Sequence, residues 1–386
     1  METIDGKLVA LDARWVFREL SGIGRYTLEL LRQLGDLGGG WRFLVLVRDA
    51  ERREFVEAAA GLGGRGNMEF AEVPFGPFAL RGQWSVARLL RARGVAVYHS
   101  TNFMIPLPAF SRREPRAIRA VCNIHDLIPM VHPEFTPRAL KTRFFPVYRA
   151  LMHEIARRVD RVLTGSESAK RDIQRLLGVA ESRIRVAADG VDARYVPGGE
   201  KPSARGGPKT ILYVGRSDPY KNLPGLVAVV ARLIEEGLPV RLRIAGPPDA
   251  RYPAAAELAQ RLNVAAHVEW LGYLDEAGLL RAYQEADVLA LLSRYEGFGL
   301  PVLEAMACGA PVIAGRGSST GEIVGPAGVL VEPSSDEELA AALDALLDDE
   351  AERARLAAAG LARAAQFQWA EAARLTREAY LEAMYS

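Results

Sequence analysis

One pattern recurs along almost the whole chain: a short run of apolar residues followed by an amphipathic stretch long enough for a helix. Such runs are typical of strands buried on both faces of a parallel sheet, and the stretches between them are typical of crossover helices. The expected strands lie at 8–11, 43–47, 95–98, 120–124, 162–165 and 184–187, and then at 210–214, 240–245, 268–271, 288–292, 311–314 and 329–331. We therefore predict an α/β protein in which helices wrap open parallel sheets.

A stretch rich in Pro and Gly separates the two series of expected strands. Residues 196–208 read VPGGEKPSARGGP, a composition typical of a linker. The 386 residues are many for one domain and enough for two, each with its own core. We predict an N-terminal domain over residues 1–192, a C-terminal domain over residues 208–366 and a final helix over residues 367–386.

Charge is divided unevenly between the two halves of the chain. Residues 1–200 contain 31 Lys and Arg against 23 Asp and Glu, a balance of +8, whereas the remaining residues contain 18 against 25, a balance of −7. A basic first half suits an anionic partner, such as a phospholipid surface or a pyrophosphate-linked acceptor. Two differently solvated faces explain the split equally well.

The cysteines and the N-terminus indicate the compartment. Cys122 and Cys308 are the two cysteines, and both lie in apolar surroundings, which fits a reducing cytoplasm and provides no metal-ligand spacing. No run approaches the roughly 18 apolar residues of a membrane span, and the first residues lack the pattern of a signal peptide. We expect a cytoplasmic protein that is soluble or peripheral at the inner face of the membrane.

Residues 293–311, SRYEGFGLPVLEAMACGAP, contain the strongest candidate for a ligand site. A glycine-containing loop leads into an expected helix that begins near Pro301, and the start of a helix attracts a phosphate or a sugar oxygen. Glu296 and Glu304 flank this start, eight positions apart, and a carboxylate can accept hydrogen bonds from both hydroxyls of a sugar diol. Helix capping by Glu296 and solvation of Glu304 would explain the same spacing.

The EGFGLPVLEAMACGAPV run that starts at Glu296 resembles the E-x7-E signature of the retaining, nucleotide-sugar-dependent glycosyltransferases of family 4. The resemblance implies the GT-B fold, in which two Rossmann-like domains with parallel sheets face each other across a cleft and a C-terminal helix crosses back to the first domain. It also implies that Glu296 contacts hydroxyls of the donor sugar and that Glu304 holds the ribose of the nucleotide. The backbone amides of Phe298, Gly299 and Leu300 are expected to reach the sugar or phosphate.

A second candidate segment, GRSDPYKN, follows the expected strand at 210–214. It begins at Gly215 and contains Arg216 and Lys221, which together offer a forked donor and a point charge to a pyrophosphate. Solvated surface cations are the ordinary interpretation of such residues. The segment, however, resembles the G-R-x4-K-N segment of family 4, whose Arg and Lys bind the donor phosphates, and this implies a catalytic role for Arg216 and Lys221.

The first half contains further candidates near the ends of expected strands. Gly22 and Gly24 directly precede an expected helix; a tight turn is the ordinary interpretation, and a contact with the donor pyrophosphate is what the resemblance implies. His125 and Asp126 follow an expected strand at the edge where open α/β sheets place ligands. A histidine bonded to backbone is the common alternative, but the resemblance places a histidine here, close to the reacting sugar. His99 is a weaker candidate, for the lining of the acceptor cleft.

Loops in the second half complete the predicted donor site. Tyr273 and Leu274 follow a further expected strand, and in similar enzymes this loop lies beside the nucleotide base. Residues 318–323, SSTGEI, resemble a loop that closes the donor pocket. No Asp-x-Asp metal motif occurs in a suitable loop, so neither a metal nor another cofactor is expected to be required. Trp369, before the last helix, is interpreted as a packing residue.

Two basic stretches are amphipathic. Residues 75–93 mix Phe, Trp and Leu with four arginines, and residues 138–158 form a long basic segment with aromatic residues near its start. Basic amphipathic helices can lie in an anionic interface. Packing of one face onto a sheet explains the pattern without a membrane and is the preferred interpretation, with peripheral contact to an anionic membrane as the alternative.

Together these observations predict a retaining GT-B glycosyltransferase that moves a hexose from a nucleotide-diphospho-sugar to a hydroxyl of a saccharide or a lipid-linked acceptor. The stretches SGIGRY, YHSTN and IHDLIP resemble bacterial polysaccharide mannosyltransferases, which implies GDP-mannose as donor. A UDP-glucose-type donor is the alternative within the family. A GT-B nucleotide-sugar epimerase and a non-catalytic sugar-binding protein are the alternatives from other classes, although a neutral saccharide needs no phosphate cations such as Arg216 and Lys221. Nucleic acid is not an expected partner.

Overall fold

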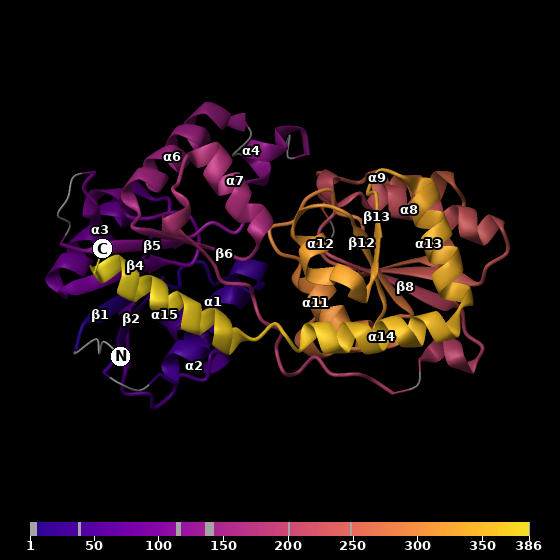
Figure 1. The fold of residues 1–386 in the computed structure, drawn as a ribbon, viewed down its shortest axis with the longest axis horizontal. Coiled ribbons are helices and arrows are strands. Elements are labelled where there is room, and N and C mark those ends of the chain that lie inside the picture. The colour runs from indigo at the N-terminus through magenta and orange to yellow at the C-terminus, as the bar shows by residue number, and fades with distance from the viewer. Residues whose placement is uncertain are drawn as a thin grey trace. The chain divides into compact units, whose positions relative to one another are not determined.

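The computed structural model describes residues 6–37, 40–112, 117–135, 143–199, 201–247 and 249–385. The chain forms two compact units, which carry separate sheets in Figure 1. Unit 1 consists of Met1–Leu127, Phe144–Gly190 and Trp369–Ser386, and unit 2 consists of Ile128–Arg143 and Val191–Gln368.

Unit 1 contains a seven-stranded sheet whose neighbouring strands are all parallel, in the order β3-β2-β1-β4-β5-β6-β7. The strands are β1 (Leu8–Asp12), β2 (Arg42–Val47), β3 (Met68–Glu72), β4 (Val95–Ser100), β5 (Arg119–Asn123), β6 (Arg161–Thr164) and β7 (Ile184–Val186). The central strand β1 is buried along its whole length; its first four residues are the predicted apolar run, and its last, Asp12, is paired with Arg14 at 2.6 Å. β3 was not predicted, because its sequence MEFAE mixes polar and apolar residues at the edge of the sheet, where it stays partly exposed.

Three of the helices that the structure describes in unit 1 begin at a side chain that caps the helix. The helices of this unit are α1 (Gly22–Gly35), α2 (Ala50–Ala59), α3 (Leu80–Ala92), α6 (Phe145–Arg158), α7 (Glu167–Leu177) and α15 (Trp369–Tyr385). Ser21, Asp49 and Ser166 each accept a backbone N–H from the first turn of α1, α2 and α7. These caps satisfy backbone donors that would otherwise be free at the start of each of the three helices.

The last helix returns to unit 1, as predicted. α15 packs against α1 and against the strands from β4 to β7, and Figure 1 shows it lying along α1. His99 of β4 ties α15 to the sheet, because Tyr380 donates its hydroxyl to Nδ1 at 2.6 Å and Nε2 donates to Asn123 Oδ1 at 2.7 Å. Burial lowers the pKa of His99 to about 4. The prediction that His99 lines an acceptor cleft is therefore wrong, since the neutral ring is buried and both nitrogens are already bonded.

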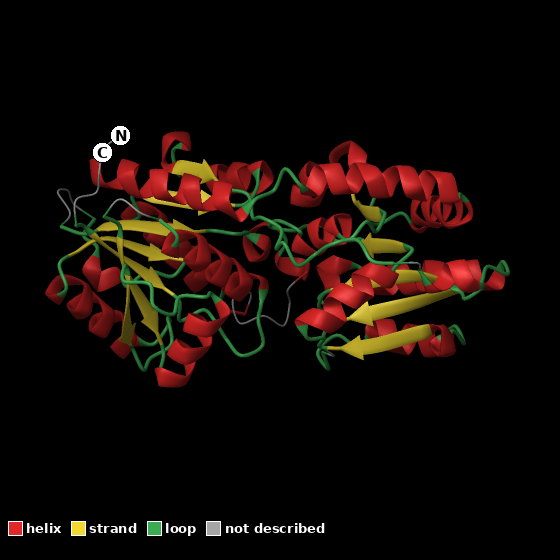
Figure 2. Ribbon diagram, turned by 90° about the horizontal axis from the view of Figure 1, so that it is seen from below, coloured by secondary structure: helices red, strands yellow, loops and turns green. Residues whose placement is uncertain are grey.

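Unit 2 contains a six-stranded parallel sheet in the order β10-β9-β8-β11-β12-β13. The strands are β8 (Lys209–Val214), β9 (Val240–Ala245), β10 (Val268–Gly272), β11 (Val288–Leu291), β12 (Val312–Gly315) and β13 (Val329–Val331). Its helices are α4 (Ile128–Val131), α8 (Leu223–Glu235), α9 (Ala254–Arg261), α10 (Glu276–Glu285), α11 (Leu300–Ala307), α12 (Ser318–Val324), α13 (Asp336–Asp348) and α14 (Glu350–Ala364). Figure 2 shows helices on both faces of the strands, so the predicted α/β architecture is confirmed. Within the described ranges no helix is both long and apolar enough to cross a membrane.

The segment Ile128–Arg143 belongs to unit 2, whereas the sequence analysis included it in the N-terminal domain. Its first residue, Ile128, forms a buried apolar cluster with Tyr220 and Tyr295 of unit 2. The segment carries no strand pattern of its own, so contacts with residues far away in the sequence decide where it packs. Such contacts are not visible in hydrophobic periodicity.

Each sheet has a point where the order of its strands reverses, between β1 and β4 in unit 1 and between β8 and β11 in unit 2. Open α/β sheets bind ligands outside the carboxyl ends of the strands at such a switch point. In unit 2, the loops that follow β8 and β11 are the two segments that carry the strongest predicted site residues.

Candidate active site

The loops after β8 and β11 bring two predicted site residues into direct contact. Lys221 Nζ lies 2.6 Å from Glu296 Oε1, and only 11% and 13% of these side chains is exposed. Ser293, just beyond β11, donates its hydroxyl to the same carboxylate oxygen at 2.6 Å. Oε1 thus accepts two hydrogen bonds, whereas Oε2 accepts none from the residues that the structure describes. The carboxylate is held by one oxygen and can offer the other to a ligand hydroxyl.

Close backbone packing shapes the loop after β8. Gly215 has φ +150°, and a Cβ there would lie 3.4 Å from Lys221 Cδ. A Cβ on Gly246, which follows β9, would lie 2.0 Å from the carbonyl oxygen of Gly215, so only glycine fits at this position. Tyr213 donates its hydroxyl to the carbonyl of Arg216 at 2.6 Å. These contacts fix the backbone from which Arg216 projects.

Arg216 extends from this loop with its side chain more than half exposed. Its Nη2 lies 2.7 Å from Oδ2 of Asp218, which is buried. Burial opposes the charged guanidinium, but the adjacent Asp218 carboxylate holds the pKa of Arg216 above its usual value. Asp218, which was not predicted, therefore positions a permanent cation whose exposed donors can bind a phosphate.

The start of α12 holds the loop that contains Glu296. The Glu296 N–H donates to Ser318 Oγ at 3.0 Å. Ser319 donates its hydroxyl to the carbonyl oxygens of Glu296 and Phe298, at 2.8 and 2.7 Å. Ser318 has a left-handed backbone with φ +53°, which is unusual for a residue other than glycine. These bonds clamp the loop; the sequence analysis singled out residues 318–323 but did not predict the clamp.

The helix α11 begins with free donors. Gly299 has φ +114°, and a Cβ there would lie 3.2 Å from Thr320 Cγ2, so close packing against α12 requires glycine. Among the described residues, nothing accepts a hydrogen bond from the N–H groups of Phe298, Gly299 and Leu300, and Pro301 has no N–H. These amides and the positive end of the helix dipole can bind an anion or a sugar oxygen, the role that the sequence analysis assigned to them.

Glu304 lies one turn into α11 and is 4% exposed, so the alternative of a solvated surface residue is wrong. Tyr283 of α10 donates its hydroxyl to Oε2 at 2.7 Å. Burial and the nearby Glu304 charge raise the pKa of Cys308 to about 12, which keeps that thiol protonated. Tyr283 was not predicted, because it approaches Glu304 from another helix.

The loop after β10 carries the two residues that were assigned to the nucleotide base. Tyr273 is exposed and Leu274 is half-buried. The N–H of Gly246 donates to the carbonyl of Gly272 at 2.8 Å and joins this loop to the one after β9. Tyr273 therefore presents an accessible ring beside the carboxyl ends of the strands, where a base can stack.

In unit 1, His125 follows β5 and lies edge-on against Tyr26, with ring centroids 5.0 Å apart. Its Nε2 lies 2.9 Å from the carbonyl oxygen of Thr101. Because a carbonyl only accepts, Nε2 carries the proton and Nδ1 is the accepting nitrogen. Burial lowers the pKa of His125 and favours this neutral ring. One nitrogen is bonded to backbone, as the common alternative holds, and the other can accept a hydrogen bond from a hydroxyl; the neighbouring Asp126 is half-buried.

Gly22 and Gly24 lie in the first turn of α1, and neither has a left-handed backbone. Ser21 Oγ accepts the N–H of Gly24 at 3.2 Å. A Cβ on Gly22 would meet nothing within 4 Å, so the fold itself does not require glycine there. The stretch is a helix start and not the tight turn that was the ordinary interpretation. Trp369 packs on Tyr26 with centroids 5.8 Å apart, which confirms its structural role.

The groups in unit 2 together define a class of ligand. A switch point of a Rossmann-like sheet, two cations, an open helix N-terminus and two oriented carboxylates suit a ligand that carries both phosphates and hydroxyl groups.

Comparisons with known proteins identify the family. Residues 20–195 match "Glycosyltransferase Family 4" and residues 200–363 match "Glycosyl transferases group 1". O-antigen chain mannosyltransferase B of Escherichia coli is 28% identical over 379 residues, which cover 94% of this chain and 96% of that protein. Glycogen synthase of Mycobacterium tuberculosis (strain ATCC 25618 / H37Rv) is 31% identical over 290 residues, which cover 74% of this chain and 69% of that protein. The structure of Anabaena HepE in complex with UDP-glucose has a TM-score of 0.75 at 19% identity and covers 96% of this chain and 98% of that one.

The chain therefore belongs to the glycosyltransferases of family 4 and has the GT-B fold. The predicted family and fold are confirmed, and so is the broad class of glycosyltransferase.

Proposed function

We propose that this glycosyltransferase transfers mannose from GDP-mannose, with retention of configuration, to a hydroxyl of a saccharide or lipid-linked acceptor in the synthesis of cell-surface polysaccharide or glycoconjugate. The observation that carries the proposal is the buried pair of Lys221 and Glu296, 2.6 Å apart, which joins a phosphate cation to a carboxylate with one uncommitted oxygen. Similarity to an O-antigen mannosyltransferase over almost the whole chain supports mannose as the sugar.

The proposed mechanism rests on charge that develops at the leaving group. Cleavage of the bond between sugar and diphosphate places negative charge on the diphosphate, which Arg216, Lys221 and the amides at the start of α11 stabilise. Glu296 Oε2 accepts hydrogen bonds from donor-sugar hydroxyls and fixes the anomeric carbon. A displacement on the same face, in which the leaving phosphate takes the acceptor proton, needs neither a carboxylate nucleophile nor a dedicated base.

The other predicted residues have supporting roles in this proposal. Glu304 holds the ribose, Tyr273 and Leu274 lie beside the base, and the backbone at Gly215 leaves room for the diphosphate. In unit 1, His125 Nδ1 accepts a hydrogen bond from a sugar hydroxyl with Asp126 beside it, and the helix start at Gly22 and Gly24 binds an anionic oxygen.

Two other functions predict different results. A UDP-glucose-type donor is supported by HepE, whose structure was determined in complex with UDP-glucose, although that likeness concerns the fold. A nucleotide-sugar epimerase would release free sugar and nucleotide without an acceptor.

Because Arg216, Lys221 and helix amides supply the positive charge, we propose that transfer needs no metal and continues in EDTA.

The decisive experiment is thermal unfolding with GDP, GDP-mannose, UDP and UDP-glucose. A ligand that binds only the native state raises the free energy of unfolding by about 2.7 kcal/mol at roughly one hundred times its dissociation constant. We expect the guanosine compounds to raise the midpoint and both Arg216→Ala and Glu304→Ala to abolish the rise.

The matched control is Arg355→Ala, because Arg355 is also an exposed, ion-paired arginine of unit 2. This variant should keep the full nucleotide response. A response to uridine compounds instead would replace GDP-mannose as donor, and no response to any nucleotide would contradict the proposed function. Product analysis with and without mannoside acceptors then separates transferase from epimerase.

Ser319→Ala tests the clamp on the Glu296 loop. The change removes hydrogen bonds to two carbonyl groups, so we expect the free energy of unfolding to fall by about 1 kcal/mol. Because the α11 amides shift with the loop, KM for the donor should rise more than kcat falls. Urea unfolding and donor-saturation kinetics measure the two effects, with Ser334→Ala at an exposed serine of unit 2 as the control. An unchanged KM would show that the clamp does not position the donor loop.

A further inference from the structure

The outer face of α3 in unit 1 exposes large apolar side chains. Leu80 is 81% exposed and Trp84 is 64% exposed, and Phe78, just before the helix, is also exposed. Leu80, Trp84 and Arg88 follow one another at intervals of four residues and so share one face of the helix. The opposite face is packed, since Val86 and other inner residues are buried. The helix is therefore packed against unit 1 on its inner face while its outer face exposes Leu80 and Trp84.

The charge of this region has one sign. Residues 75–93 contain four arginines and neither Asp nor Glu. Arg91 donates to the carbonyl of Pro108, and Arg93 pairs with Glu69. Arg81 and Arg88 are exposed and pair with no acid among the residues that the structure describes. Two guanidinium groups thus lie in the same segment as exposed Leu and Trp, and within the described ranges no carboxylate pairs with them.

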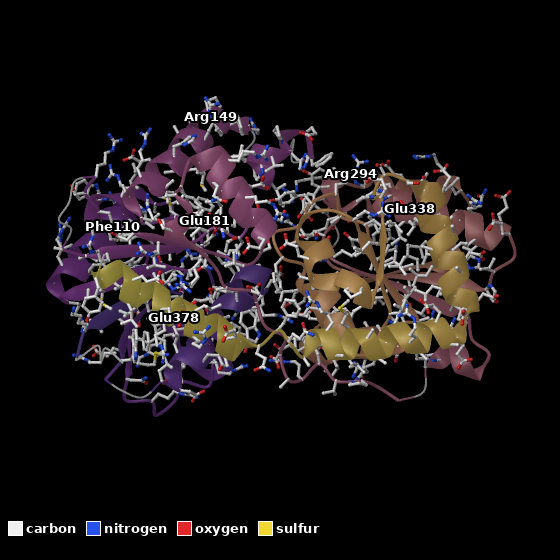
Figure 3. All side chains as sticks on the ribbon, in the orientation of Figure 1. Phe110, Arg149, Glu181, Arg294, Glu338 and Glu378 are labelled. Atoms are coloured by element: carbon white, nitrogen blue, oxygen red, sulfur yellow. The ribbon has the colours of Figure 1, made fainter. Side chains whose placement is uncertain are left out.

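The start of α6, in the same unit, also exposes apolar and basic side chains. Phe144 and Val147 are exposed there, and Arg149 extends outward from α6 in Figure 3. Phe103 links the two helices, because its ring centroid lies 5.9 Å from that of Phe78 and 6.1 Å from that of Tyr148. Residues 138–142 of the predicted basic segment lie outside the described residues. We define the basic apolar face as Phe78, Leu80, Arg81, Trp84, Arg88, Phe144, Val147 and Arg149.

We propose that the basic apolar face docks unit 1 onto an anionic lipid surface. Trp and Leu side chains enter the boundary between headgroups and acyl chains, while arginines stay at the level of the lipid phosphates. Each arginine near an anionic leaflet strengthens binding, and the absence of acids from residues 75–93 avoids repulsion. The sequence analysis preferred packing as the explanation of this stretch. Packing accounts for the inner face of α3, and the exposed Leu80 and Trp84 require another partner.

Docking to a lipid surface affects which acceptors the enzyme uses. A lipid-linked acceptor lies in the same surface, so the face would bring unit 1 to its substrate and select lipid-linked over free saccharides. This step rests on the proposed function, whereas the docking itself is a binding property and is independent of it.

The test is co-sedimentation of the whole protein with vesicles of phosphatidylcholine alone or mixed with phosphatidylglycerol. We expect binding to the mixed vesicles, with an affinity that falls as salt is added. Arg81→Ala/Arg88→Ala should weaken it by roughly thirtyfold, and Trp84→Ser should weaken it by at least about tenfold.

Matched controls keep this test specific. Arg53→Ala/Arg175→Ala removes the same charge from α2 and α7 of unit 1, and Trp270→Ser removes an exposed tryptophan from unit 2. Both should bind vesicles like wild type. Equal losses in variants and controls, equal binding to both vesicles, or no binding at all would overturn the proposal, and the last result would point to an acidic protein partner. The nucleotide-dependent unfolding midpoint should be unchanged in every variant, so failure of docking and failure of the donor site are distinguishable.

Discussion

Lys221→Ala is expected to lower kcat by roughly 10²–10³-fold, because it removes a preorganised cation from the position where phosphate charge develops. The loss should exceed the effect on donor binding, since the same change frees Glu296 Oε1 from one of its two hydrogen bonds. With Ser293 alone as partner, the carboxylate can rotate, and the oxygen presented to the donor sugar is no longer fixed. Steady-state kinetics with the donor identified by thermal unfolding measures the effect.

The variant also loses stability, and this loss must be separated from catalysis. Removing the cation leaves the largely buried Glu296 without its charged partner, which costs up to about 3–5 kcal/mol. The double variant Lys221→Met/Glu296→Gln replaces the pair by neutral side chains of similar length and should regain most of the free energy of unfolding. We expect it to stay as inactive as Lys221→Ala. Recovery of kcat together with stability would show that Lys221 acts only on the fold.

The fold could largely be predicted because burial on both faces leaves a simple sequence signal. Strands such as β1 and β8 each contain an apolar run that is buried in the sheet, whereas the Pro- and Gly-rich stretch at 196–208, interpreted as a linker, falls within unit 2, which begins at Val191. β3 lacked that signal because it is an edge strand with mixed faces. The segment Ile128–Arg143 was misplaced because an apolar cluster between distant residues, and not local periodicity, decides where it packs.

The candidate site shows the same division between local and distant information. Arg216, Lys221, Glu296 and Glu304 could be found because each lies in a short motif after a strand. The bond between Lys221 and Glu296 spans 75 positions, so nothing in either motif shows that the two share one cluster. Tyr283 and the bonds from Ser319 to the Glu296 loop were missed for the same reason, as each residue reaches its partner from a different helix. Ser293, three positions before Glu296, and Asp218, two positions after Arg216, are partners that local spacing could have indicated.

The second large effect is expected at Asp189, whose ionisation should make the free energy of unfolding depend on pH. It follows β7, is buried, and its Oδ1 has no hydrogen-bond partner among the described residues. Burial raises the pKa of Asp189 to about 7 in the folded protein, whereas 3.8 is the ordinary value. The carboxyl group is therefore neutral in the fold at acidic pH, and its ionisation at higher pH places an uncompensated charge in the interior.

The direction of the pH dependence follows from the difference between the pKa of Asp189 in the folded protein and its ordinary value. Because the folded protein holds the proton more tightly than the unfolded chain, the free energy of unfolding should fall as pH rises from about 4 to about 7, by about 4 kcal/mol in total. Asp189→Asn keeps a neutral group of the same shape, so it should remove this slope and be the more stable protein at about pH 8. Urea unfolding across this range measures both proteins, and Asp36→Asn, the same change at an exposed aspartate of unit 1, should keep the wild-type slope. A parallel pH dependence in wild type and Asp189→Asn would show that a partner for the Asp189 carboxylate, such as an ordered water, stabilises its charged form in the fold.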